Sequence, residues 1–283
     1  MRYLLKSQGE RVKREGESKT MNLTRIYALM MRYLYLYPRS VPRIMDIFFW
    51  PVVELLIWGF LTMYLQQSKI AIPNFINALL GALIFWNFIQ RSQQAVSIAF
   101  LEEVWERNLL NIFVTPLKIT EFLVATVLVG IIRLALIGVT ISVLAFLLFK
   151  FNIFFFGFYL IPFVLNLFAF GWILGLVATS IIMRFSQSAQ VLAFALTILF
   201  QPFVAVFYPV SVLPPPLQYF AYIIPATHVF EGMRAVVFTG HLSLLSLLLA
   251  TGLNIIWFII TMRIFFRMFD YILETGQLMR LVD

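Results

Sequence analysis

Long apolar stretches constrain this chain more than any other feature. Six of them lie at about residues 45–65, 75–99, 119–149, 153–183, 189–211 and 243–266. Each has the length of roughly 20 residues that a helix needs to cross the hydrocarbon core of a bilayer. Charged residues make up only 12% of the chain, about half the share in a soluble domain, which is too few to cover a water-facing surface. The sequence therefore predicts an all-α integral membrane protein with six transmembrane helices.

The remaining segments are short. Residues 1–21 are polar and basic and are expected to form a disordered tail, with Met21 as an alternative start. We expect one transmembrane domain over residues 22–268 and a C-terminal tail over residues 269–283. The chain has no cysteine, which excludes disulfides and thiolate metal sites. Its two histidines, His228 and His241, lack a set of neighbours with metal-ligand spacing, so no metal site is predicted.

The placement of Lys and Arg predicts the orientation. With the N-terminus in the cytoplasm, only Lys69, Lys150 and Arg234 fall in outside segments, and most other basic residues fall inside. Cytoplasmic loops of membrane proteins carry such an excess, so both termini are expected in the cytoplasm. The net charge of +8 is then explained by topology and attraction to anionic lipid, and no nucleic-acid partner is predicted.

Two cytoplasmic segments have amphipathic helical patterns. Residues 22–38 place apolar side chains at helical spacing and end at Pro38, which predicts a helix in the membrane interface. It could be an anchor, or a lever that transmits motion from a soluble partner. Residues 101–113 also predict one amphipathic helix, and Thr115 and Pro116 either end it or start the next helix. This helix could merely connect two spans, or it could dock into a cleft on a soluble partner. Its apolar stripe is Leu101, Val104, Trp105, Leu109, Ile112 and Phe113, and its polar face is Glu102, Glu103, Glu106, Arg107, Asn108 and Asn111.

The segment between the last two spans is too apolar for an ordinary loop and too rich in proline for a span. Pro214 and Pro225 predict two short helices, at roughly 216–223 and 227–238, that dip back into the outer leaflet. Glu231 and Arg234 are three residues apart, which predicts a local ion pair. In the fifth span, Pro202 and Pro209 should kink the helix, and such kinks suit a gate.

Ionisable residues within spans are costly and usually face the protein interior. Counted from the span ends, Glu54 and Arg133 lie at similar depth, so we predict that they pair. Arg91 is an alternative partner for Asp46 or Glu54. An unpaired Glu54 facing a central path could contact a cationic substrate group. Next to Arg91, the polar residues Gln90, Gln93, Gln94 and Ser97 predict either a helix that emerges early into water or the mouth of a path.

Two motifs resemble the ABC-2 type permeases, the membrane subunits of type V ABC exporters. "ERNLLNIFVTPLKITEFLVA" resembles the segment after their second span, and "LPPPLQYFAYIIPATHVFEGMRAV" resembles their extracellular signature. The similarity extends over about residues 22–268.

The resemblance implies a dimer of two identical six-span subunits around a central path in the cell inner membrane. Two copies of a separate ATPase would bind on the cytoplasmic side and carry the ATP and Mg²⁺, because this chain has no cofactor site of its own and lacks a phosphate-binding loop. The coupling residues would be Glu102, Glu103, Trp105, Glu106, Arg107, Asn108, Phe113 and Pro116. The segment with Pro214, Pro225, Glu231 and Arg234 would cap the exit.

Three readings of function remain open from the sequence. The first is the non-catalytic permease half of an ATP-driven exporter of a drug, lipid or lipid-linked glycan. A secondary transporter would more often show inverted repeats and ion-coupling charges at mid-membrane, and no repeat is visible. A membrane-embedded lipid-modifying enzyme would need clustered acids or histidines, or a nucleophile beside a base, and the sequence has no such arrangement.

Overall fold

Helices account for every regular element in the part of the chain that the structure, a computed structural model, describes: residues 21–67, 74–185 and 189–275. The predicted all-α class is confirmed there. The elements are α2 (Leu23–Leu36), η1 (Tyr37–Arg39), α3 (Val41–Gln67), α4 (Phe75–Trp105), α5 (Leu109–Val114), α6 (Ile119–Phe149), η2 (Ile153–Tyr159), α7 (Leu160–Phe185), α8 (Leu192–Phe200), η4 (Val210–Val212), α9 (Pro215–Ile223), α10 (Pro225–Thr239) and α11 (Leu244–Thr275).

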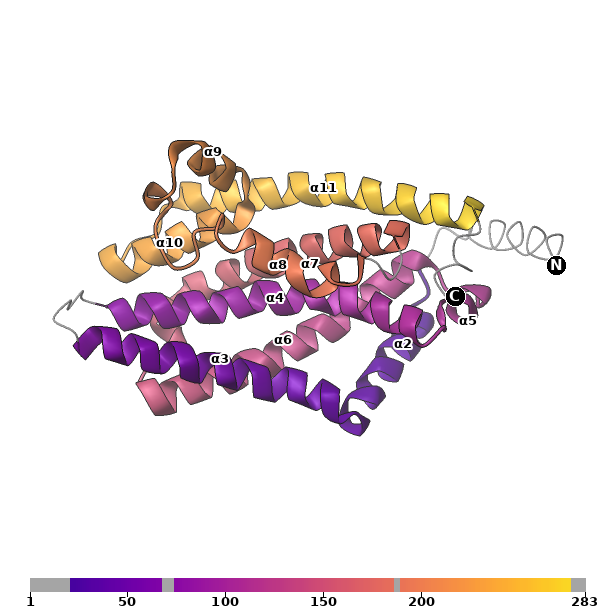
Figure 1. The fold of residues 1–283 in the computed structure, drawn as a ribbon, viewed down its shortest axis with the longest axis horizontal. Coiled ribbons are helices and arrows are strands. Elements are labelled where there is room, and N and C mark those ends of the chain that lie inside the picture. Colours follow the sequence, from indigo (N-terminus) through magenta and orange to yellow (C-terminus); the bar gives the residue numbers. More distant parts are fainter. Residues whose placement is uncertain (1–20, 68–73, 186–188, 276–283) are drawn as a thin grey trace.

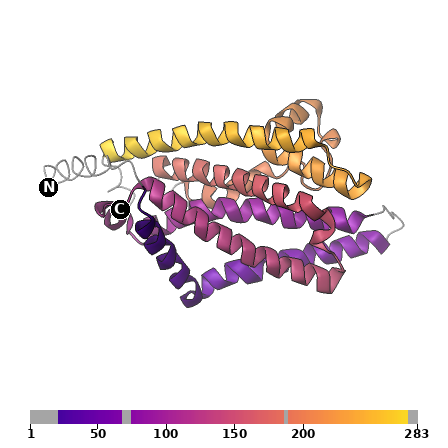
Figure 2. The ribbon, with the colours of Figure 1, turned by 180° about the vertical axis from the view of Figure 1, so that it is seen from behind.

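The long helices run side by side along the length of the molecule (Figure 1). Helices α2 and α5 lie at one end, which we call the α2 end, and α9 lies at the other, the α9 end. Helices α3 and α11 form opposite edges, and the view from behind shows the same order (Figure 2).

Helix α4 is the central element and packs against α3, α6, α7, α8 and α10. It approaches α7 most closely at Gly171 and Gly175, four residues apart. A Cβ atom at Gly171 would lie 2.4 Å from the carbonyl oxygen of Ile89, and one at Gly175 would lie 2.7 Å from that of Gln93. Small residues at this spacing let two membrane helices touch along their backbones.

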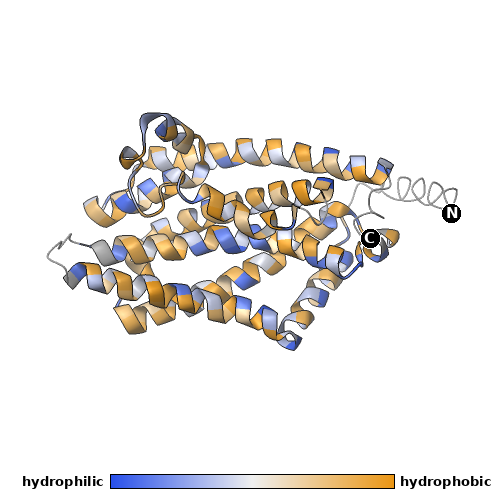
Figure 3. Cartoon of the chain, viewed as in Figure 1, coloured by the Kyte–Doolittle hydropathy of each residue, from blue (hydrophilic) through white to orange (hydrophobic). Residues whose placement is uncertain are grey.

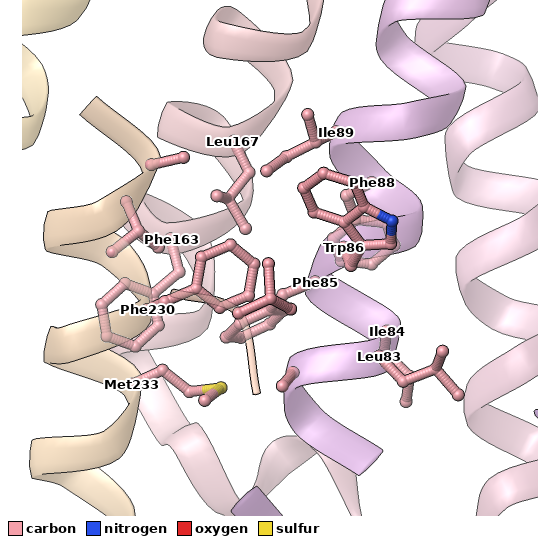
Figure 4. Packing of buried hydrophobic residues seen from close by; sticks show 14 of the residues in the cluster. Leu83, Ile84, Phe85, Trp86, Phe88, Ile89, Phe163, Leu167, Phe230 and Met233 are labelled. Atoms are coloured by element: carbon pink, nitrogen blue, oxygen red, sulfur yellow. The ribbon is translucent and has the colours of Figure 1, made fainter. Parts of the chain in front are cut away.

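The two larger of three hydrophobic clusters among the described residues fill the bundle. The larger includes Phe85 of α4, Phe163 of α7 and Phe230 of α10, all fully buried. Figure 4 shows these rings meeting between the three helices. The second cluster joins the inner face of α2 to the ends of α4, α6 and α11. The apolar face of α2 is thus packed on the protein, through Ile26, Leu29 and Tyr33.

Four described segments are long and apolar enough to cross a membrane: Val41–Gln66, Ile119–Phe149, Ile153–Phe185 and Leu244–Thr275. Hydrophobic residues cover most of the length of α3, α6 and α11 (Figure 3). Helix α4 is equally long, but its Asn, Gln and Arg side chains reduce its apolarity. The second predicted span is therefore present as a helix of sufficient length, although it is less apolar than the other four.

The prediction of a continuous fifth span over residues 189–211 is wrong. Helix α8 ends at Phe200, and residues 201–208 form turns and bends, with Ala205 in the left-handed region at φ 55°. Pro202 explains the stop, because its ring collides with the preceding turn of a helix and it has no N–H to donate. The predicted kink is instead an unwound segment.

Candidate functional site

A tight turn separates α4 from α5, where the sequence predicts one amphipathic helix. Helix α4 ends at Trp105, Arg107 adopts a left-handed backbone with φ 53°, and α5 begins at Leu109. The Asn108 N–H donates to the carbonyl of Glu103 at 2.9 Å, which closes the turn. The prediction of one helix over residues 101–113 is therefore wrong, because the sequence pattern does not show that the Asn108 backbone bonds to the last turn of α4.

This turn divides the predicted apolar stripe. Leu101, Val104, Leu109 and Ile112 are buried in the protein. Trp105 is 48% exposed, and its indole N–H donates to Gln190 Oε1 at 3.2 Å, just before α8. The side chain of Phe113 lies outside the described part of the chain. Most of the stripe is therefore committed to the fold.

Glu103 is the most buried acidic side chain of the predicted polar face, at 1% exposure. Its carboxylate forms an ion pair with Arg32 of α2 at 2.8 Å. It also accepts hydrogen bonds from the Tyr33 hydroxyl at 2.8 Å and from Asn108 Nδ2 at 2.8 Å. Burial, together with the nearby carboxylate of Glu103, raises the pKa of the Tyr33 phenol well above its ordinary value, so the hydroxyl remains a neutral donor. One carboxylate thus connects α2, the end of α4 and the turn before α5.

The two neighbouring carboxylates connect the same turn to α3. Glu102 accepts two hydrogen bonds from the Arg43 guanidinium, at 3.1 and 3.2 Å. Glu106 is 3.6 Å from Arg43 and 3.8 Å from Arg32. We call these five residues, Arg32, Arg43, Glu102, Glu103 and Glu106, the charged junction. Bidentate contacts of this kind fix the relative orientation of the groups they join.

Glu121 joins the start of α6 to the start of α2. It is fully buried, and its two oxygens accept from the backbone N–H groups of Lys118 at 3.0 Å and Asn22 at 2.8 Å. Both donors belong to helix N-termini, which lack intrahelical acceptors. Arg25 lies 3.8 Å from the same carboxylate and also donates to the carbonyl of Pro116. Helix α2 is therefore held at both ends by carboxylates, one from the last turn of α4 and one from the first turn of α6.

One surface of this end remains uncovered in the described chain. Its exposed residues are Trp105, Glu106, Arg107, Asn111, Val114, Thr115 and Pro116. They all lie between the last residue of α4 and the start of α6, and we call them the exposed loop surface. Their backbone is linked to α2 and α3 by the charged junction and by Arg25.

A second charge cluster lies deeper in the bundle. The carboxylate of Asp46 on α3 forms ion pairs with Arg91 of α4 and Arg133 of α6, each at 2.7 Å. Arg133 also lies over the ring of Tyr37, 5.0 Å from its centroid. The predicted ion pair of Asp46 with Arg91 is confirmed, whereas the predicted pair of Glu54 with Arg133 is wrong. The prediction assumed that α3 and α6 begin at the same depth in the membrane. The first turns of α6 instead pack on α2, so α6 begins closer to the α2 end than α3 does.

A cavity of about 290 Å³ separates the charged junction from this cluster. Arg43, Glu102 and Trp105 line it toward the loop, and Asp46 and Arg133 line it toward the bundle. Behind it, Gln93 and Ser97 of α4 are completely buried, and Gln93 accepts a hydrogen bond from Thr197 of α8 at 2.9 Å. The prediction that α4 emerges early into water at these residues is therefore wrong, because α7 and α8 cover them.

At the α9 end, the two predicted short helices are present as α9 and α10. Their first turns contain Pro215 and Pro225, where the missing N–H is tolerated, and Pro214 is the N-cap of α9. The predicted pair of Glu231 with Arg234 is confirmed at 2.9 Å.

Arg234 also donates to the carbonyls of Ala205 and Val206, at 2.8 and 3.2 Å, and Glu231 accepts from the N–H of Val210 at 2.7 Å. These bonds satisfy two carbonyls of the unwound segment between Pro202 and Pro209 and the first N–H of η4.

Several contributing residues were not predicted, namely Arg25, Arg32, Tyr33, Arg43 and Glu121. The sequence does contain one relevant signal, the complementary charge of two segments. Residues 25–43 carry basic side chains, and residues 102–106 carry acidic ones. Among the described residues, no group of three or more metal-binding side chains is present.

The comparisons with known proteins agree with this architecture. A search of curated proteins finds no match to the chain. The family model described as ABC-2 type transporter matches residues 24–238, from the first turn of α2 to the last turns of α10. This range includes the charged junction, the Asp46 cluster and the contacts of Arg234. The chain therefore belongs to the ABC-2 type transporter family and is a multi-pass membrane component of an ABC transporter.

Proposed function

We propose that this chain is the permease subunit of an ATP-driven exporter and that a separate ABC ATPase docks on the exposed loop surface. The α2 end then faces the cytoplasm, in agreement with the distribution of Lys and Arg. ATP and Mg²⁺ are held by the ATPase. The spans are α3, α4, α6, α7, α8 with its unwound continuation, and α11.

The observation that carries the proposal is the connection between the exposed loop surface and three helices. Glu103 connects the loop to α2, Glu102 connects it to α3, and Glu121 connects the start of α6 to α2. A force on the loop would therefore displace α2 and α3 together, because bidentate carboxylate–guanidinium contacts fix the relative orientation of the groups they join. This makes α2 a lever as well as an anchor.

Transport requires two states with different access. In our proposal, closure of two ATPase subunits pushes the loops of two permease copies together in the inner membrane, and the Asp46 cluster carries this motion from α3 to α4 and α6. The cavity beside the cluster gives the side chains room to rearrange. The contacts of Arg234 keep the unwound segment closed toward the outside until α3 moves. The substrate class is amphipathic or hydrophobic.

Two sets of variants test this proposal in the complex of the permease with its cognate ATPase. A docking variant, Trp105→Ala with Asn111→Arg, should lose co-purification of the ATPase. A junction variant, Arg43→Ala, should retain the ATPase but lose the ATP-dependent change in a spin–spin distance between α3 and α11. Spin labels can be placed freely because the chain has no cysteine.

The matched control is Tyr219→Ala, which removes an exposed aromatic side chain at the opposite end of the molecule. It should retain both ATPase binding and the distance change. Normal ATPase binding by the docking variant, or a normal distance change in the junction variant, would refute the proposal.

A further inference from the structure

Glu54 is an uncompensated carboxylate in the middle of a span. It stands 13 residues from each end of α3, about 20 Å along the axis in either direction. The side chain is half-buried, and it forms no ion pair or hydrogen bond with the rest of the described chain. The other acidic residue within α3, Asp46, has two arginine partners. A charge in hydrocarbon without a partner is costly and marks a functional position.

Two tryptophans flank Glu54 on the same face of the helix. Trp50 precedes it by four residues and Trp58 follows it by four, and side chains at this spacing are neighbours on a helix surface. Trp50 is 54% exposed. Trp58 stacks on Phe207 of the unwound segment, with ring centroids 4.6 Å apart. Indole rings bind cations through their faces more strongly than other aromatic side chains do.

This face continues into the features described above. Trp50 lines the 290 Å³ cavity together with Asp46 and Phe194 of α8. At its other end, Phe207 belongs to the segment whose carbonyls are held by Arg234. A ligand on the face of Trp50, Glu54 and Trp58 would therefore lie between the cavity and the unwound segment, along the α3 edge (Figure 1).

We propose that Trp50, Glu54 and Trp58 form a binding site for lipophilic monovalent cations. These cations would be the substrate class of the exporter, and only this second statement rests on the proposed function. One carboxylate matches one positive charge, and the flanking indoles match an apolar or aromatic body. An anion of the same shape would be repelled by Glu54. Of two molecules that partition into the bilayer equally well, the site would therefore bind the cation and reject the anion.

Equilibrium binding of radiolabelled tetraphenylphosphonium tests the site on the permease alone, in nanodiscs of zwitterionic phosphatidylcholine. Glu54→Gln removes the charge and keeps the shape, and Glu54→Asp keeps the charge. Asp270→Asn makes the equivalent change at an exposed position of α11. We expect Glu54→Gln to weaken binding about tenfold or more, as for loss of a charge-assisted contact. Glu54→Asp and Asp270→Asn should remain within about threefold of the unchanged protein.

Radiolabelled tetraphenylborate, which has the same shape and the opposite charge, should show no binding above that of empty nanodiscs when it is measured alone. Equal binding of tetraphenylphosphonium by the unchanged protein and Glu54→Gln would overturn the site, and so would saturable binding of tetraphenylborate to the unchanged protein. Loss of the permease dimer in Glu54→Gln, seen by size-exclusion chromatography, would show instead that Glu54 contacts a second copy.

A second arm measures ATP-driven uptake of the same cation into vesicles that contain the complete complex. Charge-selective binding without uptake would support the site and count against the exporter assignment, so the two failures are distinguishable.

Discussion

Removal of the Glu103 carboxylate should release α2 from the end of α4. Glu103→Ala leaves the Arg32 guanidinium, the Tyr33 hydroxyl and Asn108 Nδ2 without the acceptor that each now has at 2.8 Å. Loss of one partner of a buried ion pair costs about 3–5 kcal/mol. The Arg32 side chain is 33% exposed, so water can solvate it in part, and we expect a cost of about 3 kcal/mol. At tenfold per 1.4 kcal/mol, local opening of α2 becomes roughly 100-fold more frequent.

A single introduced cysteine reports this opening. Leu29→Cys places a thiol on the buried face of α2, at a position that is 7% exposed, in a chain without other cysteines. When opening is rapid, its reaction rate with a maleimide follows the open population. The rate should rise roughly 100-fold when Glu103→Ala is added.

The matched control is Glu106→Gln, which alters a carboxylate that is 49% exposed and more than 3.5 Å from its arginine partners. An exposed pair of this kind contributes at most about 1 kcal/mol, so the labelling rate should change less than about fivefold. Arg32→Ala combined with Glu103→Ala should cost less than the sum of the single changes, because the two residues interact. A labelling rate for Glu103→Ala within fivefold of the parent protein would refute the role of Glu103.

Three further predictions concern the rest of the bundle. Gly171→Ala should lower the thermal midpoint of the purified protein, with a cost of about 1–3 kcal/mol from overpacking. The control Gly252→Ala should not lower it, because a Cβ at Gly252 meets no atom within 4 Å. Equal midpoints for the two variants would contradict the close contact of α4 with α7. Asp46→Asn should destabilise the protein by about 3 kcal/mol or more, because two arginines lose their partner, and adding Arg133→Gln should recover part of the loss in a melting assay; no recovery would argue against the pair. Arg234→Lys should increase proteolysis of residues 201–208, because one ammonium cannot replace a planar guanidinium that contacts two carbonyls and Glu231. The control Arg267→Lys on α11 should leave the cleavage rate unchanged. An unchanged rate in Arg234→Lys would contradict the role of Arg234 in holding the unwound segment.

Hydropathy predicted the helices that pack mainly through apolar contacts. The bundle class, α2, α9, α10 and the pair of Glu231 with Arg234 follow from periodicity, prolines and local spacing, all of which act over a few residues. The fifth span failed because apolarity does not distinguish a helix from an unwound segment whose carbonyls are satisfied from elsewhere. Arg234 lies 29 residues from Ala205, so its role depends on tertiary structure.

The sequence pattern drew attention to residues 101–116, but the contacts within this segment were not predicted. The pattern from 101 to 113 predicted a polar face that contains the glutamates, but it did not predict the turn at 106–108 or show that Glu102 and Glu103 are bound by Arg43 and Arg32. The prediction for the Asp46 cluster was wrong in part for a geometric reason. Residues at equal distances from the starts of α3 and α6 do not lie at equal depths in the membrane, because the first turns of α6 pack on α2. Charge complementarity between residues 25–43 and 102–106 was the one unused signal.

Site-specific cross-linking tests the central claim most directly. A photoreactive label is attached to a cysteine at Asn111, on the exposed loop surface, or at Tyr219, at the α9 end, in complexes with the cognate ATPase. We predict that the label at position 111 cross-links to the ATPase and that ATP changes the yield, whereas the label at position 219 gives no cross-link. Cross-linking from position 219, or none from position 111 in an intact complex, would contradict the assignment of the loop as the ATPase contact.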